Sequence, residues 1–166
     1  MLTTNQKGAI AESRIIAAAV ELGIDVYRPV IEGCRADLIL DAGAALLRIQ
    51  CKWANREGDV VVVRGRTSRH TPRGYVNTTY SASEIDGIAA WCADTQECYF
   101  VPIAEIDGRA CLHLRLAPAR NQQKLLVHWA SQYRFGAIAQ LGERRAGSAK
   151  VVGSSPTSST LEGPLT

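Results

Sequence analysis

The stretch ADLILDAGAALLRIQCKW, residues 36–53, decides the fold of this chain. Residues 36–41 and 46–53 are rich in branched apolar side chains and predict two strands, with Gly43 at the turn between them. Successive side chains of a strand point to opposite faces, so Gln50 and Lys52 share one face of the second strand. A hairpin brings both within reach of Asp37 on the first strand. The stretch therefore predicts a β-hairpin that carries an acid, an amide and an amine side by side.

A helix is predicted before this hairpin, over residues 4–22. Thr3 or Thr4 can cap its start, its interior is rich in Ala, Ile and Glu, and Gly23 ends it. Glu12 lies on the apolar stripe that packs the helix over the sheet. A carboxylate there is costly unless something pairs with it, and the polar residues of the hairpin are candidate partners. Glu12 taken alone is equally well explained as an ordinary salt-bridged glutamate.

The rest of the chain predicts further strands and one more helix. We expect strands over residues 24–29, 59–63, 86–93, 97–102 and 110–116, and a helix over 122–133 with Leu125, Leu126, Trp129 and Tyr133 on its inner face. This mixture predicts an α/β fold in which helices flank a mixed sheet.

Composition limits the class of protein. A chain of 166 residues with 46% hydrophobic and 21% charged residues has room for one soluble domain. It contains neither a run suited to crossing a bilayer nor an obvious signal peptide, so we expect a cytoplasmic protein with no membrane partner. The five cysteines lack metal-binding spacing and are expected to be buried thiols without structural zinc.

Positive charge is concentrated in one segment, although the net charge is only +3. Residues 64–77 are rich in Gly, Pro and Thr, which favours a non-helical basic loop. Such a loop can follow a phosphate backbone, or it can simply be a solvated loop. The residues expected to contact nucleic acid are Arg64, Arg66, Arg69, Arg73, Tyr75 and Asn77.

Residues 136–166 differ in composition from the rest and favour a disordered tail after a domain of residues 1–135. Codons for residues 138–144 can be written to resemble the D-arm of a transfer RNA gene, and codons for 153–156 the T-arm. We interpret the tail as a reading frame that runs through a neighbouring transfer RNA gene.

The four polar residues suit metal-assisted hydrolysis of a phosphodiester. That reaction needs a cation on the phosphoryl oxygens, a positioned water and positive charge near the transition state. Asp37 is the expected principal ligand of Mg²⁺, or of Mn²⁺ in its place, with Glu12 as a second carboxylate and Gln50 as a neutral oxygen ligand. Lys52 is expected to position the attacking water and to offset negative charge.

These residues resemble the motif of the PD-(D/E)XK nucleases. The similarity is carried by Lys7-Gly8-x-x-x-Glu12, Arg28-Pro29-Val30, residues 35–41 and residues 48–52, and it continues into residues 120–136. It is strongest to the branch found as cyanobacterial group I intron homing endonucleases.

The resemblance implies a restriction-endonuclease-like core and Mg²⁺-dependent cleavage of double-stranded DNA, with catalytic positions at Glu12, Asp37, Gln50 and Lys52. A Gln at the third position departs from the general consensus but occurs in the homing branch. A homo-oligomer, dimer or tetramer, would let two sites address two strands. The alternatives are a Holliday-junction-resolving, restriction or repair nuclease, and a DNA-binding module whose site has decayed.

Overall fold

The computed structural model describes residues 1–31, 33–43, 45–72, 74–118 and 126–140. Its elements are α1 (Thr4–Glu21), β1 (Asp25–Tyr27), β2 (Leu38–Asp41), β3 (Leu46–Glu57), β4 (Val60–Arg64), β5 (Arg66–Thr71), β6 (Gly74–Thr79), β7 (Gly87–Cys92), β8 (Glu97–Pro102), α2 (Ile103–Ile106), β9 (Cys111–Arg115), β10 (His128–Trp129) and the 3-10 helix η1 (Ala130–Tyr133).

Strand β3 is the centre of the fold because it is long enough to join two groups of strands. Its first residues, 46–49, pair antiparallel with β2. Its middle residues, 49–54, pair on the other side, parallel with β7, which in turn pairs with β8. Its last residues pair with β4, which continues through β9 to β10. Strand β1 lies at the far edge beside β2. The predicted mixed sheet and the predicted hairpin of residues 36–53 are both confirmed.

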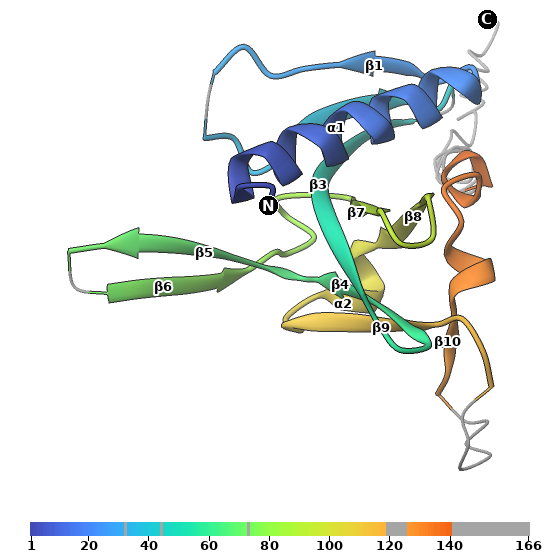
Figure 1. Ribbon diagram of the computed structural model, residues 1–166. Coiled ribbons are helices and arrows are strands. Elements are labelled where there is room, and N and C mark those ends of the chain that lie inside the picture. Colours follow the sequence, from blue (N-terminus) through green and yellow to red (C-terminus); the bar gives the residue numbers. More distant parts are fainter. Residues whose placement is uncertain (32, 44, 73, 119–125, 141–166) are drawn as a thin grey trace, which may run out of the picture.

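Helix α1 lies across one face of this sheet, against β1, β3 and β7 (Figure 1). Thr3 caps it in a capping box, because the Thr3 hydroxyl accepts from the Gln6 backbone N–H while the Gln6 side chain accepts from the Thr3 N–H. The helix buries Ile15 and Ala19 against Leu38, Leu47, Ile49 and Phe100 of the sheet. Among the described helices, none has the length and apolar character needed to cross a membrane.

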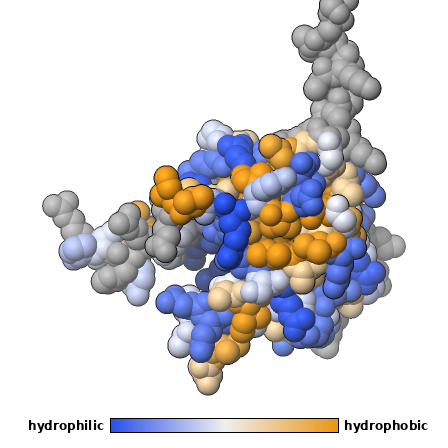
Figure 2. All heavy atoms as spheres, turned by 90° about the horizontal axis from the view of Figure 1, so that it is seen from above, coloured by the Kyte–Doolittle hydropathy of each residue, from blue (hydrophilic) through white to orange (hydrophobic). Residues whose placement is uncertain are grey.

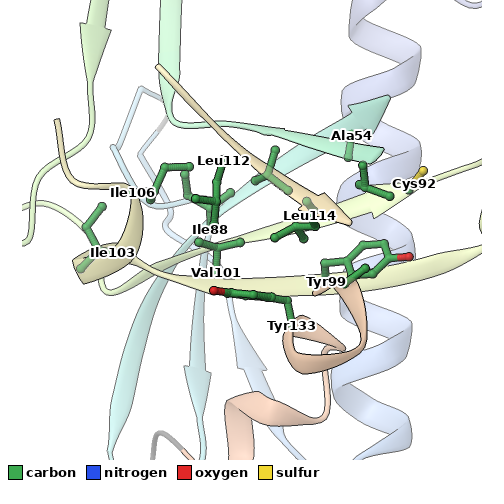
Figure 3. Close-up of a cluster of buried hydrophobic side chains, with 14 of the residues drawn as sticks. Ala54, Ile88, Cys92, Tyr99, Val101, Ile103, Ile106, Leu112, Leu114 and Tyr133 are labelled. Carbon is green, nitrogen blue, oxygen red and sulfur yellow. The ribbon is translucent and has the colours of Figure 1, made fainter. Parts of the chain in front are cut away.

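The opposite face of the sheet carries a second apolar cluster (Figure 3). Ile88 and Val101 of the central strands meet Leu112 and Leu114 of β9, and α2 and η1 close the cluster through Ile103, Ile106 and Tyr133. Apolar layers pack against both faces of the sheet and hold β3 in place between them. The polar side chains that β3 carries are therefore positioned by a rigid strand.

The basic segment is a hairpin rather than a loop. β5 and β6 pair antiparallel in a separate sheet, with Arg66 opposite Thr79 and Thr71 opposite Gly74. This hairpin arm (residues 66–79) projects away from the rest of the molecule (Figure 1). The Thr and Val side chains along the arm favour extended backbone, and this outweighs the local Gly and Pro.

The helix predicted over residues 122–133 is wrong where the structure describes it. Residues 122–125 lie outside the described residues, and residues 128–133 form β10 and η1 instead. Leu126 has a φ of 56°, which no α-helix accommodates, and its side chain is exposed rather than turned inward. The cysteines also differ from expectation, since Cys92 alone is fully buried and Cys34 is exposed, although all are free.

The described chain continues beyond the predicted domain boundary at residue 135. Ile138 is fully buried with Phe135 in the cluster beneath α1. The segment of residues 136–140 is therefore anchored to the domain through Ile138, and the remainder of the predicted tail, residues 141–166, lies outside the described residues.

Candidate active site

Asp37 is fixed at the mouth of the β2–β3 hairpin. Its backbone N–H donates to the Ile49 carbonyl at 2.8 Å, which extends the strand pairing by one residue. Its carboxylate oxygen Oδ2 accepts from the Cys51 backbone N–H at 2.8 Å and from the Gln50 side-chain amide. Among the described residues no group donates to Oδ1. The strand therefore orients the carboxylate and leaves one oxygen for a ligand.

Burial raises the pKa of the Asp37 carboxyl above its usual value. The Cys51 N–H and the charges of Lys52 and Arg28 act in the opposite direction, while the charge of Glu12 raises the pKa further. These influences place an acid, a lysine and an arginine close enough to Asp37 to change its ionisation. A raised carboxyl pKa means that keeping Asp37 ionised costs free energy, which a bound cation would return.

Glu12 reaches the same place from α1. Its side chain is 24% exposed and forms an ion pair with Arg28, whose side chain is 63% exposed. Arg28 follows β1 directly, and the Glu12 partnership raises its pKa. Sequence reasoning did not assign a role to Arg28. The only signal for it was the Arg28-Pro29-Val30 segment, which is one of those that resemble the PD-(D/E)XK nucleases.

One cleft contains both carboxylates. It has a volume of about 450 Å³ and is lined by Glu12 and Asp37, by Arg28 and the residues after it, and by Gly33, Cys34 and Ala36. The predicted convergence of Glu12 and Asp37 is therefore present in the structure.

Lys52 lies on β3 two residues beyond Gln50, with its ammonium 5.0 Å from the centre of the Tyr80 ring. Tyr80 is buried, and the Arg35 guanidinium stacks on the same ring at 4.4 Å. Arg35 is itself held by Glu84, with Nε 2.8 Å from Oε1. Sequence reasoning missed Tyr80 as the aromatic partner of Lys52 and Arg35 as a second cation on the same ring, because nothing local in the sequence marks a contact between segments so far apart.

Gln50 contacts Asp37 in a way that differs from the predicted ligand role. It is 9% exposed, and its amide nitrogen faces the Asp37 carboxylate while the same nitrogen lies 3.4 Å from the Cys51 carbonyl. In this orientation Gln50 holds Asp37 in place. Rotation of the amide group by half a turn would present its oxygen instead.

The residues of the cleft fit a hard divalent cation. Mg²⁺ binds carboxylate oxygens from one or two residues and retains several waters, and Asp37 and Glu12 offer such oxygens side by side. No group of three or more acidic, His or Cys side chains suited to a metal occurs among the described residues, so the protein would supply few ligands and water the rest. Burial raises the pKa of the neighbouring Cys51 thiol, which keeps it neutral and argues against a thiolate ligand.

The residues predicted to bind nucleic acid lie outside the cleft. Arg64 ends β4, and Arg66, Tyr75 and Asn77 are exposed on the hairpin arm, where Asn77 bonds to Ser68 at 2.5 Å. Arg69 lies on β5, but its side chain and the whole of Arg73 lie outside the described residues. The structure therefore separates a polar cleft from a basic arm.

Comparisons with known proteins agree with this arrangement. A family model described as PD-(D/E)XK endonuclease matches residues 2–136. A solved structure of a bacterial homing endonuclease, I-Ssp6803I, superimposes with a TM-score of 0.66 at 21% identity, covering 93% of this chain and 100% of that chain. No curated protein matches the chain. The family match spans most of the sequence, including the whole hairpin and the helix that carries Glu12, so this chain belongs to the PD-(D/E)XK endonucleases.

Proposed function

We propose that the protein is a Mg²⁺-dependent endonuclease that hydrolyses phosphodiester bonds of double-stranded DNA. The observation that carries the proposal is the shared cleft of Glu12 and Asp37 beside the strand that bears Gln50 and Lys52. The family supports a nuclease, and the choice of ion and of duplex DNA rests on the oxygen donors of the cleft and on the basic arm.

In this mechanism a bound Mg²⁺ would polarise the phosphoryl oxygens and lower the pKa of a water. Asp37, held by Cys51 and Gln50, and Glu12 would hold the ion. Lys52, whose charge already acts on Asp37, would orient the attacking water and stabilise the negative charge that develops on the phosphate. The Tyr80 ring would restrict the movement of the ammonium, which lies 5.0 Å from the ring centre.

The hairpin arm would hold the duplex against the cleft. A two-stranded ribbon fits the major groove, and arginines along it can contact phosphates or guanine edges. In Figure 1 the segment that follows β1 and the hairpin arm project toward the same side of the molecule, which suits a duplex lying between them. Arg64, Arg66, Arg69, Arg73, Tyr75 and Asn77 are the proposed contacts.

A homing-type role and a homo-oligomer are part of the proposal. The solved neighbour is a bacterial homing endonuclease, and this chain shares its fold. Seen from above, the face over α1 and β1 gathers apolar side chains within a hydrophilic surround (Figure 2). Val20, Leu22 and Tyr27 are exposed in this part of the chain, which supports self-association beside the edge strand β1.

Lys52→Met is expected to slow cleavage about a hundredfold while the protein still binds DNA, because the substitution removes the group that orients water and stabilises the developing charge. The measurement is the rate of cleavage of supercoiled plasmid in Mg²⁺, and a reaction with a metal chelator gives the background rate. Lys7→Met is the matched control, since Lys7 also lies over an aromatic ring, that of Trp53, at 5.6 Å.

Cleavage by the Lys52→Met protein at the rate of the Lys7→Met protein would contradict the assigned role of Lys52. Binding of DNA without cutting by the unsubstituted chain in Mg²⁺ and in Mn²⁺ would favour a non-catalytic DNA-binding module. Preferential cutting of a four-way junction over linear duplex would favour a junction-resolving enzyme.

A further inference from the structure

Arg28 is placed where a metal ion would have to bind. Its guanidinium engages Glu12 through Oε1, and both residues line the cleft that also contains Asp37. The charge of Arg28 also lowers the pKa of Asp37, although it is the smallest of the influences on that carboxyl, so Glu12 is the main partner of the guanidinium. The cleft thus contains its own positive charge in the absence of any cation.

The Arg28–Glu12 ion pair is not a buried one, since the Arg28 side chain is 63% exposed and the Glu12 side chain 24% exposed. Exposed ion pairs stabilise a fold little, because water screens them and long side chains lose freedom on pairing. Fold stability therefore does not explain why the chain places an arginine on this glutamate. A role at the carboxylate itself explains it better.

We propose that Arg28 is an internal counter-ion that occupies Glu12 until a divalent cation displaces it, so that metal binding and the Arg28–Glu12 pair exclude each other. The inference rests on the proposed function. A doubly charged ion offers Glu12 and Asp37 a stronger partner than one guanidinium, and Arg28, at the mouth of the cleft, can turn outward without disturbing a strand. The released guanidinium then faces the side from which a DNA phosphate approaches.

The test is divalent binding by the full chain without DNA. We expect Arg28→Met to bind Mn²⁺ about tenfold more tightly than the unsubstituted protein, because the ion no longer competes with a guanidinium. Free Mn²⁺ counted by electron paramagnetic resonance gives the affinity, including dissociation constants in the millimolar range. Arg134→Met is the matched control: Arg134 pairs with Glu97 at 3.0 Å and is similarly exposed, yet neither residue lines this cleft.

A double-substitution cycle separates competition at Glu12 from general charge repulsion. On the Glu12→Gln background, Arg28→Met is expected to tighten Mn²⁺ binding no more than about twofold, since the shared carboxylate is gone. Equal gains on both backgrounds, or equal affinities of the Arg28→Met, Arg134→Met and unsubstituted proteins, would overturn the inference. Absence of Mn²⁺ binding in every variant would overturn it as well.

The proposed function fails separately. If the unsubstituted protein cleaves plasmid and Arg28→Met leaves the Mn²⁺ affinity unchanged, the counter-ion role of Arg28 is wrong and the nuclease function stands. If Arg28→Met binds Mn²⁺ more tightly but the unsubstituted protein never cuts DNA, the counter-ion role stands and the nuclease function is wrong.

Discussion

Asp37→Asn is expected to reduce DNA cleavage about ten-thousandfold, since it removes the charge of the principal metal ligand. The substitution preserves shape, and the asparagine oxygen can still accept from the Cys51 N–H that now binds Oδ2. Loss of activity would then reflect chemistry rather than unfolding. Single-turnover cleavage of a duplex in saturating Mg²⁺ measures the effect.

The same substitution is expected to stabilise the metal-free protein at neutral pH. Burial raises the pKa of Asp37 in the folded state, so the unfolded chain ionises at lower pH than the fold. The contribution of Asp37 to stability is therefore complete below the unfolded pKa and is lost as pH rises through the folded pKa. Asparagine carries no such cost, and its Tm should exceed that of the unsubstituted protein at pH 7, with the difference vanishing in acid.

Asp41→Asn is the matched control because it makes the same change in the same hairpin, at the last residue of β2. Asp41 accepts from the Gly43 N–H at 2.9 Å in the hairpin turn, outside the cleft. The Asp41→Asn protein should cleave DNA at nearly the rate of the unsubstituted protein. Retention of activity by Asp37→Asn, or equal loss in both variants, would contradict the role assigned to Asp37.

Asp86→Ala is expected to lower the free energy of unfolding by about 3 kcal/mol, the largest structural effect we foresee. The buried Asp86 carboxylate accepts from the Arg48 backbone N–H at 2.8 Å and from the Arg48 side chain at 3.2 Å. Its own backbone N–H donates to the Arg48 carbonyl at 2.8 Å. Removal of the carboxylate leaves the N–H of Arg48 unpaired where β3 begins to pair with β7.

Urea denaturation measures this loss, and Asp59→Ala serves as the control. Asp59 is exposed and lies 3.8 Å from Arg56, so its removal should change stability by less than about 0.5 kcal/mol. Similar midpoints for the two variants would mean that the Arg48–Asp86 contact does not hold the strands together.

The sequence was sufficient to bring Gln50 and Glu12 close to Asp37, because the relevant signals are local. Alternation in residues 36–53 and the turn at Gly43 predicted the hairpin, and the pairing of Leu38 with Ile49 places Asp37 beside Gln50 as expected. Glu12 was predicted from its position on an apolar stripe of a capped helix. Each of these inferences needed only the spacing of apolar side chains along one element and the direction in which the next element runs.

The supports of the site were not predictable in this way. Arg35 contacts Glu84 across a separation of 49 residues, and Tyr80 meets Lys52 only because the hairpin arm returns to the sheet. Arg28 follows an edge strand whose pairing is visible only in the fold. Apolar spacing alone also gave a wrong prediction of a helix over residues 122–133. There the pairing of β10 with β9 and the left-handed backbone of Leu126 prevent a helix despite the helical spacing of apolar residues.

Anomalous diffraction from crystals of the protein soaked in Mn²⁺ shows directly whether the two carboxylates hold a cation. We expect a Mn²⁺ peak in the cleft, bound by Asp37 and adjacent to Glu12, with the Lys52 ammonium turned toward it. A peak at another site, or an ion in the cleft that contacts neither carboxylate, would rule out the assigned metal site.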